Sequence, residues 1–163
     1  MDLTRRRFFY GAGAIVATIV ATTARARSAT ASPGDFEVTH TDAEWQQLLS
    51  ADQYNVLRKA GTEMPYSSPL NDEHDHGVFS CAGCALDLFA SDTKFDSGTG
   101  WPSFWQPLDG AVLERADDSI GVSRTEVLCR RCGGHLGHVF DDGPPPTGLR
   151  YCMNGDAMTF RST

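Results

Sequence analysis

The chain has 163 residues, of which 40% are hydrophobic and 21% are charged, so it can form one hydrophobic core but is too short for two full domains. It carries 14 Lys and Arg against 21 Asp and Glu, and this formal charge of -7 argues against binding to nucleic acid through phosphate contacts. Five cysteines are too few for a disulfide scaffold, and their odd number leaves at least one unpaired.

The first 31 residues have the layout of a signal peptide. Arginines at positions 5–7 precede an uncharged and largely apolar run over residues 8–23. Small residues follow, and we expect cleavage after Ala26 or Ala31. The alternative is an uncleaved membrane anchor, but the apolar run is shorter than the roughly 20 residues that a transmembrane helix needs.

The arginines and the two phenylalanines that follow them resemble a twin-arginine export signal. This resemblance implies export of the folded protein, with a periplasmic location and no contact with the membrane except during export. Loss of residues 1–31 would remove five arginines and one aspartate, which would shift the formal charge from -7 to -11.

Residues 36–163 are expected to form one domain that begins with two short helices. Thr41 is a helix N-cap followed by acidic residues, and apolar residues from Trp45 onward repeat at helical spacing. A second helix is predicted over residues 52–59, with Gly61 ending it.

After the helices, the sequence predicts short strands separated by turns. Each predicted strand is rich in β-branched or aromatic residues. The predicted strands are Gly77–Ser80, Ala111–Leu113, Ser119–Val122 and Thr125–Leu128. Residues 71–76 are polar and predict a loop, in which the two histidines face solvent and are not metal ligands. The domain is therefore expected to be mainly antiparallel β.

Four of the five cysteines form two Cys-x-x-Cys units, Cys81 with Cys84 and Cys129 with Cys132. Four thiolates about 2.3 Å from the metal suit a tetrahedral zinc ion, and a complete sulfur shell leaves no position open for catalysis. A thioredoxin-like redox motif is the competing interpretation, but it would open a helix in a βαβ unit and would need no second copy. We therefore expect one structural zinc ion that joins two distant parts of the domain.

Cys152 is the cysteine that remains. A lone cysteine is usually a small buried hydrophobic residue. In a strand, however, Arg150, Cys152 and Asn154 would share one face, while Tyr151 and Met153 would point to the other. A guanidinium group beside a thiol favours the thiolate, so Cys152 is a candidate nucleophile.

Two histidines and a tryptophan are candidates to complete a site around Cys152. His135 and His138 directly follow the second cysteine pair. They could be metal ligands or surface residues, but an imidazole changes protonation near neutral pH, which favours proton transfer beside the thiol. Trp101 lies between glycines and a proline. Such a residue is most often part of the core, yet its loop position indicates the wall of a small apolar pocket.

Taken together, these motifs resemble the B-type methionine sulfoxide reductases. The resemblance extends over about residues 40–160, and its most specific segments are 94–104 and 133–144. It implies a β-tent fold of two antiparallel sheets with short flanking N-terminal helices, pinned by a structural zinc. It also implies thiol-dependent reduction of the R epimer of methionine sulfoxide, mainly in proteins and peptides, as repair of oxidative damage.

The resemblance also implies roles for individual residues. Those with a catalytic role are Cys152, His138, His135, Asp142, Asn154 and Arg150. The thiolate attacks the sulfoxide sulfur and becomes a sulfenic acid, while a proton reaches the departing oxygen from a histidine. Substrate binding falls to Trp101, which receives the S-methyl group, and to Phe104.

Two positions depart from the family pattern. Many members have a cysteine at position 99, which attacks the sulfenic acid to form a disulfide, but this chain has Thr99. The other cysteines are committed to zinc, so an external thiol, either a thioredoxin-like protein or a small thiol, is expected to act as reductant. Gly155 replaces the usual serine, which would remove one hydrogen bond.

A non-catalytic, zinc-stabilised binding module of the same fold is the alternative function. Such a module would not need Cys152. The enzyme interpretation predicts oxidised proteins or peptides and the thiol reductant as partners, and a monomeric chain.

Overall fold

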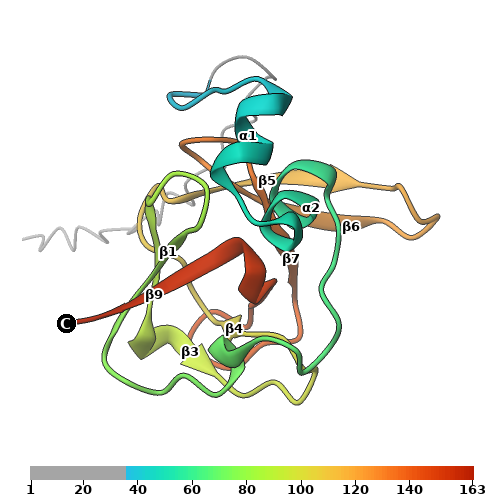
Figure 1. The fold of residues 1–163 in the computed structure, drawn as a ribbon. Coiled ribbons are helices and arrows are strands. Elements are labelled where there is room, and N and C mark those ends of the chain that lie inside the picture. The colour runs from blue at the N-terminus through green and yellow to red at the C-terminus, as the bar shows by residue number, and fades with distance from the viewer. Residues whose placement is uncertain (1–35) are drawn as a thin grey trace, which may run out of the picture.

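Two antiparallel sheets and two short helices make up the computed structural model of the protein, which describes residues 36–163 (Figure 1). The expected signal peptide over residues 1–31 lies outside the described residues. Within the described part, no helix combines the length and the apolar character needed to cross a membrane. The prediction of a mainly β fold with short N-terminal helices is confirmed.

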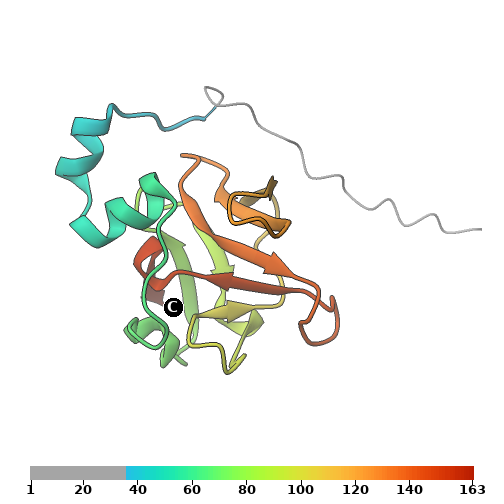
Figure 2. The same cartoon turned by 90° about the vertical axis from the view of Figure 1, so that its right-hand side faces the viewer.

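The helices are α1 (Asp42–Leu48) and α2 (Ala51–Lys59). Each begins with a capping box, in which the side chain of Thr41 or Ser50 accepts a hydrogen bond from the third helical residue and that residue's side chain bonds back. The second helix ends where Ala60 adopts a left-handed conformation with φ 53°, one residue before the predicted glycine. Figure 2 shows both helices on one side of the sheets.

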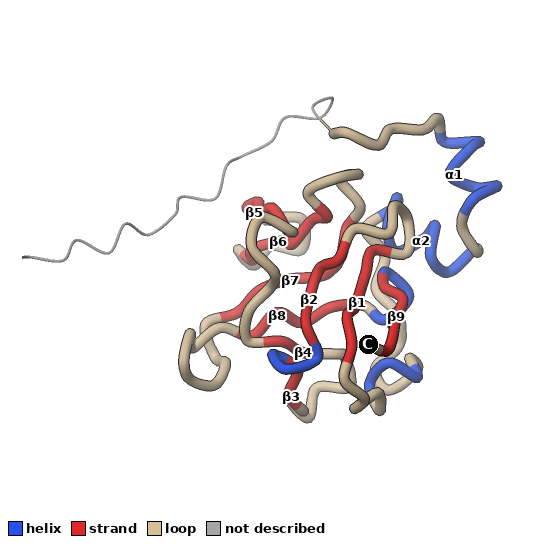
Figure 3. Tube along the Cα trace, turned by 90° about the vertical axis from the view of Figure 1, so that its left-hand side faces the viewer, coloured by secondary structure: helices blue, strands red, loops and turns tan. Residues whose placement is uncertain are grey.

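A three-stranded sheet has the order β2-β1-β9 (Figure 3). Its strands are β1 (Gly77–Cys81), β2 (Asp87–Ala90) and β9 (Met158–Ser162). The strand that ends the chain therefore pairs with the first strand, which closes the domain.

A six-stranded sheet has the order β3-β4-β8-β7-β6-β5. Its strands are β3 (Lys94–Phe95), β4 (Ser103–Phe104), β5 (Val112–Asp117), β6 (Arg124–Cys129), β7 (His135–Phe140) and β8 (Arg150–Met153). Short 3-10 turns occur at Pro69–Asn71, Ser91–Thr93 and Gly155–Ala157. All pairings in both sheets are antiparallel.

The prediction of a strand over Ser119–Val122 is wrong. These residues form the turn between β5 and β6, where Gly121 has φ 77° and its N–H donates to the carbonyl of Asp118 at 3.2 Å. The β-branched residues there suit a strand, but the neighbouring Asp, Ser and Gly residues suit a turn, and the turn connects the paired strands β5 and β6. The predicted strands Gly77–Ser80 and Thr125–Leu128 lie within β1 and β6, and Ala111–Leu113 overlaps the start of β5, which begins at Val112.

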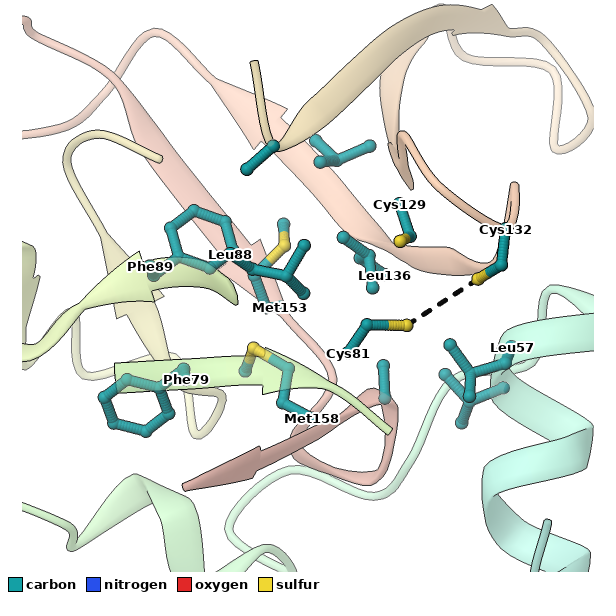
Figure 4. Close-up of a cluster of buried hydrophobic side chains, with 14 of the residues drawn as sticks. Leu57, Phe79, Cys81, Leu88, Phe89, Cys129, Cys132, Leu136, Met153 and Met158 are labelled. Carbon is teal, nitrogen blue, oxygen red and sulfur yellow. Dashed lines mark hydrogen bonds between the residues drawn. The ribbon is translucent and has the colours of Figure 1, made fainter. Parts of the chain in front are cut away.

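Three phenylalanines join the two sheets. Phe104 of β4 stacks on Phe89 of β2 with ring centroids 4.4 Å apart, and contacts Phe79 of β1 edge-on at 4.9 Å. Figure 4 shows Phe79 and Phe89 among the other buried side chains, with Met153 of β8 nearby. Phe104 has no exposed surface, so it belongs to the core. The resemblance implies that Phe104 binds substrate, and its complete burial contradicts this expectation.

We predict that Phe104→Ala lowers the free energy of unfolding by about 3–5 kcal/mol, because it removes a ring packed between the two sheets and leaves a cavity. Urea denaturation followed by circular dichroism measures the change. Leu48→Ala is the control, since Leu48 is 59% exposed and its loss should cost less than about 0.5 kcal/mol. Equal stabilities of the two variants would contradict the assignment of Phe104 to the core.

Candidate active site

The four cysteines of the two Cys-x-x-Cys units converge between the sheets. Their Sγ atoms all lie within 4.8 Å of one another. The Sγ atoms of Cys81 and Cys132 are 3.7 Å apart (Figure 4), and those of Cys84 and Cys129 are 3.4 Å apart. A tetrahedral shell with metal–sulfur bonds of about 2.3 Å places sulfur atoms about 3.8 Å apart, so this cluster fits a four-sulfur metal site.

The two units have the same backbone conformation. In each, the residue after the second cysteine donates its N–H to the carbonyl of the first cysteine at 2.8 Å, from Ala85 to Cys81 and from Gly133 to Cys129. Both donors adopt positive φ values, 55° and 67°. Arg58 of α2 also donates to the carbonyl of Cys132 at 3.0 Å, so the cluster connects both sheets and a helix.

Cys152 lies on β8, between β4 and β7. In the register of these strands, Ser103 and His138 are its direct neighbours on the two sides. Tyr151 and Met153, which flank Cys152 in sequence, are buried, so the predicted alternation of faces along this strand is present.

A cavity of about 150 Å³ opens at Cys152. Four residues singled out in the sequence line it together: Trp101, His138, Cys152 and Asn154. The remaining lining residues are Thr62, Arg124, Gly137 and Phe140, which the sequence analysis missed. A side chain at position 137 would collide with the carbonyl oxygen of Cys152, since a Cβ there would lie 2.1 Å from it. The glycine therefore allows β7 to approach the thiol strand closely.

Burial affects the pKa of the Cys152 thiol more than the nearby positive charge does. Burial raises its pKa above the ordinary value, and this effect outweighs the Thr99 hydroxyl, 3.8 Å from Sγ, and the positive charge of Arg150, which both lower it. The sequence-based argument that Arg150 favours the thiolate has the right sign, but the net pKa shift is upward. The thiol form therefore predominates at neutral pH.

Asp142 does not line the Cys152 cavity. Its carboxylate accepts two hydrogen bonds from the Arg150 guanidinium, both at 2.8 Å, and that guanidinium lies over the Phe140 ring at 4.4 Å. Hydrogen bonding to Arg150 lowers the pKa of Asp142. Asp142 thus orients Arg150 and stays ionised, which leaves it poorly suited to proton donation.

The two histidines have separate partners. His138 Nε2 forms a 2.7 Å hydrogen bond with Asp117 at the end of β5, and burial holds the pKa of His138 below its ordinary value. His135 Nδ1 bonds instead to Glu126 at 2.7 Å, and its ring is buried away from the cavity. Of the two histidines, His138 lines the cavity and His135 does not.

Asp117 links His138 to Arg124. One carboxylate oxygen contacts both His138 Nε2 and the Arg124 guanidinium, the latter at 2.6 Å, while the other accepts the N–H of Ser119 at 3.0 Å. Hydrogen bonds from Ser119 and His138 hold the pKa of Asp117 far below its ordinary value, so it is ionised at neutral pH. No sequence pattern pointed to Asp117, because Arg124 and His138, which connect it to the cavity, lie on other strands.

Glu63 bonds to two of the residues that line the cavity. Its backbone N–H donates to Asn154 Oδ1 at 3.1 Å, and its carbonyl accepts the Trp101 indole N–H at 3.2 Å. Its buried carboxylate accepts the N–H groups of Gly155 and Asp156 at 2.8 and 2.7 Å. Glu63 thereby fixes two cavity-lining side chains, Trp101 and Asn154, relative to β8.

Gly155, one of the two departures from the family pattern, has a structural explanation. A Cβ at this position would lie 1.9 Å from the Ser68 hydroxyl, so Ser68 occupies the space that a side chain would need. Thr99, the other departure, belongs to a chain of hydroxyl groups. Ser97 Oγ lies 2.8 Å from both Thr99 and Ser103, and Thr99 contacts Cys152.

Comparison with known proteins gives one consistent result. The SelR domain family matches residues 49–162. Curated proteins named peptide methionine sulfoxide reductase MsrB are similar over most of the chain. The protein from Leptospira interrogans serogroup Icterohaemorrhagiae serovar Lai is 52% identical over 128 residues, 78% of this chain and 98% of its own. Those from Agrobacterium fabrum and Methanosarcina barkeri are 53% and 49% identical, over 76% and 77% of this chain and 93% and 89% of their own.

We predict one equivalent of zinc per chain, bound by the four-cysteine cluster. Cys84→Ser should lose the metal and unfold at a lower temperature, because the remaining three thiolates leave the shell incomplete. Cys152→Ser is the matched control and should keep the full metal content. Inductively coupled plasma mass spectrometry of the purified proteins measures the zinc, and a metal loss in Cys152→Ser would contradict the division between the cysteines.

We also predict that alkylation of Cys152 by iodoacetamide requires a higher pH than that of an exposed cysteine, because only the thiolate reacts and burial raises the pKa. Arg150→Gln should move the midpoint to still higher pH, since it removes the cation that lowers the pKa. Arg161→Gln on β9 is the control and should leave the profile unchanged. A downward shift in Arg150→Gln would show that Arg150 does not stabilise the thiolate.

Proposed function

We propose that Cys152 is the nucleophile of this chain, which belongs to the SelR domain family and is a peptide-methionine (R)-S-oxide reductase. The observation that carries this proposal is the position of Cys152. It lies outside the four-sulfur cluster and lines the cavity that Trp101, His138 and Asn154 also line. Nucleophile, proton-transfer group and apolar wall thus meet in one small cavity.

The pKa shifts define which proton moves first. Cys152 has a raised pKa and His138 a lowered one, so a protonated thiol faces a neutral imidazole at neutral pH. We infer that His138 accepts the thiol proton as Cys152 attacks the sulfoxide sulfur, and then donates this proton to the sulfoxide oxygen. Asp117, bonded to Nε2, stabilises the imidazolium that forms between the two transfers.

The oxygen moves from one sulfur to the other. The S–O bond of the methionine sulfoxide breaks, methionine leaves with its sulfur reduced by two electrons, and Cys152 keeps the oxygen as a sulfenic acid. Trp101 provides the apolar wall for the S-methyl group, and Asn154 the polar side of the cavity. Both are held by Glu63, which we infer to be a positioning residue.

An external thiol completes the cycle in this proposal. At the position where many family members have a second cysteine, this chain has Thr99. Its hydroxyl lies 3.8 Å from Cys152 Sγ and cannot form a disulfide. A first thiol attacks the sulfenic acid, releasing water and forming a mixed disulfide. A second thiol then breaks this disulfide and regenerates Cys152. The source is a thioredoxin-like protein or a small thiol.

We further propose that the chain acts as a monomer after export to the periplasm, with residues 1–31 as a twin-arginine signal peptide. The arginines followed by an apolar run and small residues support this location. The four-cysteine cluster supports export in the folded state, since a metal bound beforehand keeps these thiols from forming disulfides in an oxidising compartment.

We predict that the metal-loaded protein, with dithiothreitol as reductant, removes oxygen from the R epimer of a methionine sulfoxide peptide and leaves the S epimer unchanged. Cys152→Ser should lower kcat by at least about 10³-fold, because no other described thiol lines the cavity. Mass spectrometry measures the oxygen loss. Retained turnover in Cys152→Ser would refute the nucleophile, and no turnover in the metal-loaded wild type would favour the binding module.

We predict that the double substitution Arg5→Lys and Arg6→Lys blocks export of the full-length chain and leaves the precursor inside the cell. The reason is that the twin-arginine pathway recognises this pair of arginines. Cell fractionation followed by N-terminal sequencing of the exported form measures the effect and the cleavage site. Arg25→Lys, beyond the apolar run, is the control and should not block export. Unimpaired export of the double variant would show that another route is used.

A further inference from the structure

A larger cavity adjoins the one at Cys152. Its volume is about 710 Å³, against about 150 Å³ for the Cys152 cavity. It is formed by the hairpin of β5 and β6, which projects from the body of the molecule (Figure 1), together with the end of β7. Arg124 and Phe140 line both cavities, so the two share a wall. We call the larger cavity the hairpin groove.

The hairpin groove presents apolar side chains to solvent. Ile120 and Val122, in the turn between β5 and β6, are 64% and 62% exposed. Val139, Phe140 and Leu149 line the same groove. Apolar side chains that are this exposed bury little surface in the folded domain. Clustered exposed apolar residues commonly mark a binding surface.

The charge of the groove is negative. Glu114 and Asp141 contribute two carboxylates, and the only cation among the lining residues is Arg124. That guanidinium is paired with Asp117 at 2.6 Å, so it does not neutralise the groove. A basic side chain entering the groove would therefore be attracted, and an acidic one repelled.

The groove is also connected to the catalytic machinery. Asp117, at the turn end of the hairpin, bonds to both Arg124 and His138, which ties the hairpin to two residues that line the Cys152 cavity. An extended polypeptide advances about 3.3 Å per residue. Because Arg124 and Phe140 line both cavities, a polypeptide whose methionine sulfoxide side chain enters the Cys152 cavity would carry its neighbouring residues to the hairpin groove.

We propose that the hairpin groove binds the polypeptide segment beside the methionine sulfoxide, and that it selects a segment with one apolar and one basic residue. This inference rests on the proposed function of Cys152. The smaller cavity accommodates the oxidised side chain, and the groove adds the contacts that distinguish one oxidised site in a protein from another.

Three short peptides that contain R methionine sulfoxide test this selection. The sulfoxide is flanked by Leu and Lys in the first, by Leu and Glu in the second and by glycines in the third. Kcat/KM for the Leu-Lys peptide should exceed that for the glycine peptide by about tenfold, the usual discrimination from one apolar contact. The Leu-Glu peptide should fall between them or below both, and its disadvantage should shrink at high salt.

Substitutions of groove residues test whether the hairpin groove causes the peptide preference. The double substitution Ile120→Ser and Val122→Ser should abolish the preference for the Leu-Lys peptide over the glycine peptide, mainly through KM. Asp141→Asn should narrow the difference between the Leu-Lys and Leu-Glu peptides. Leu48→Ser, at an equally exposed apolar residue on α1, is the matched control and should keep both preferences. Equal kcat/KM for all three peptides, or preferences unchanged in the variants, would overturn the proposal.

Binding to Cys152→Ser tests the groove separately from turnover. Fluorescence anisotropy with labelled peptides should show about tenfold tighter binding of the Leu-Lys peptide than of the glycine peptide. Equal affinities would overturn the groove while leaving the proposed chemistry intact. Absence of turnover with every peptide, together with the expected binding preference, would instead contradict the chemistry alone.

Discussion

The backbone pairing of β8 with β4 and β7 is the constraint on which the site depends. It places Ser103 and His138 directly opposite Cys152. Cross-strand neighbours have Cβ atoms about 4.5–5.5 Å apart, so the sheet itself places a hydroxyl and an imidazole beside the thiol. The register is held by Tyr151 and Met153, which are buried on the other face, because a slip of one residue would expose both of them.

Burial decides the resting state of the thiol. The Arg150 charge lowers the pKa of Cys152, but Asp142 shares that guanidinium, and the desolvation of Sγ is the larger effect. A thiol is a poor nucleophile until its proton leaves, so the raised pKa lowers the reactivity of Cys152 in its resting state. In the proposed function, the proton then passes to His138, whose lowered pKa leaves its ring neutral.

Two acidic residues that do not line the cavity hold side chains that do. Asp117 holds His138 and Arg124, and so connects the hairpin of β5 and β6 to the site. Glu63 holds Trp101 and Asn154, and its carboxylate receives the N–H groups at the end of β8. Each residue has several hydrogen-bond partners, so these two hydrogen-bond networks fix the positions of the side chains that line the cavity.

The sequence by itself determined what depends on local spacing. Two Cys-x-x-Cys units identified the four clustered cysteines and left Cys152 as the candidate nucleophile, and alternation along β8 predicted which of its side chains are buried. Only the tertiary structure decided that Phe104 belongs to the core, that His138 and not His135 lines the cavity, and that residues 119–122 form a turn. Spacing within one element determines which side chains share a face, but contacts between distant strands determine what that face meets.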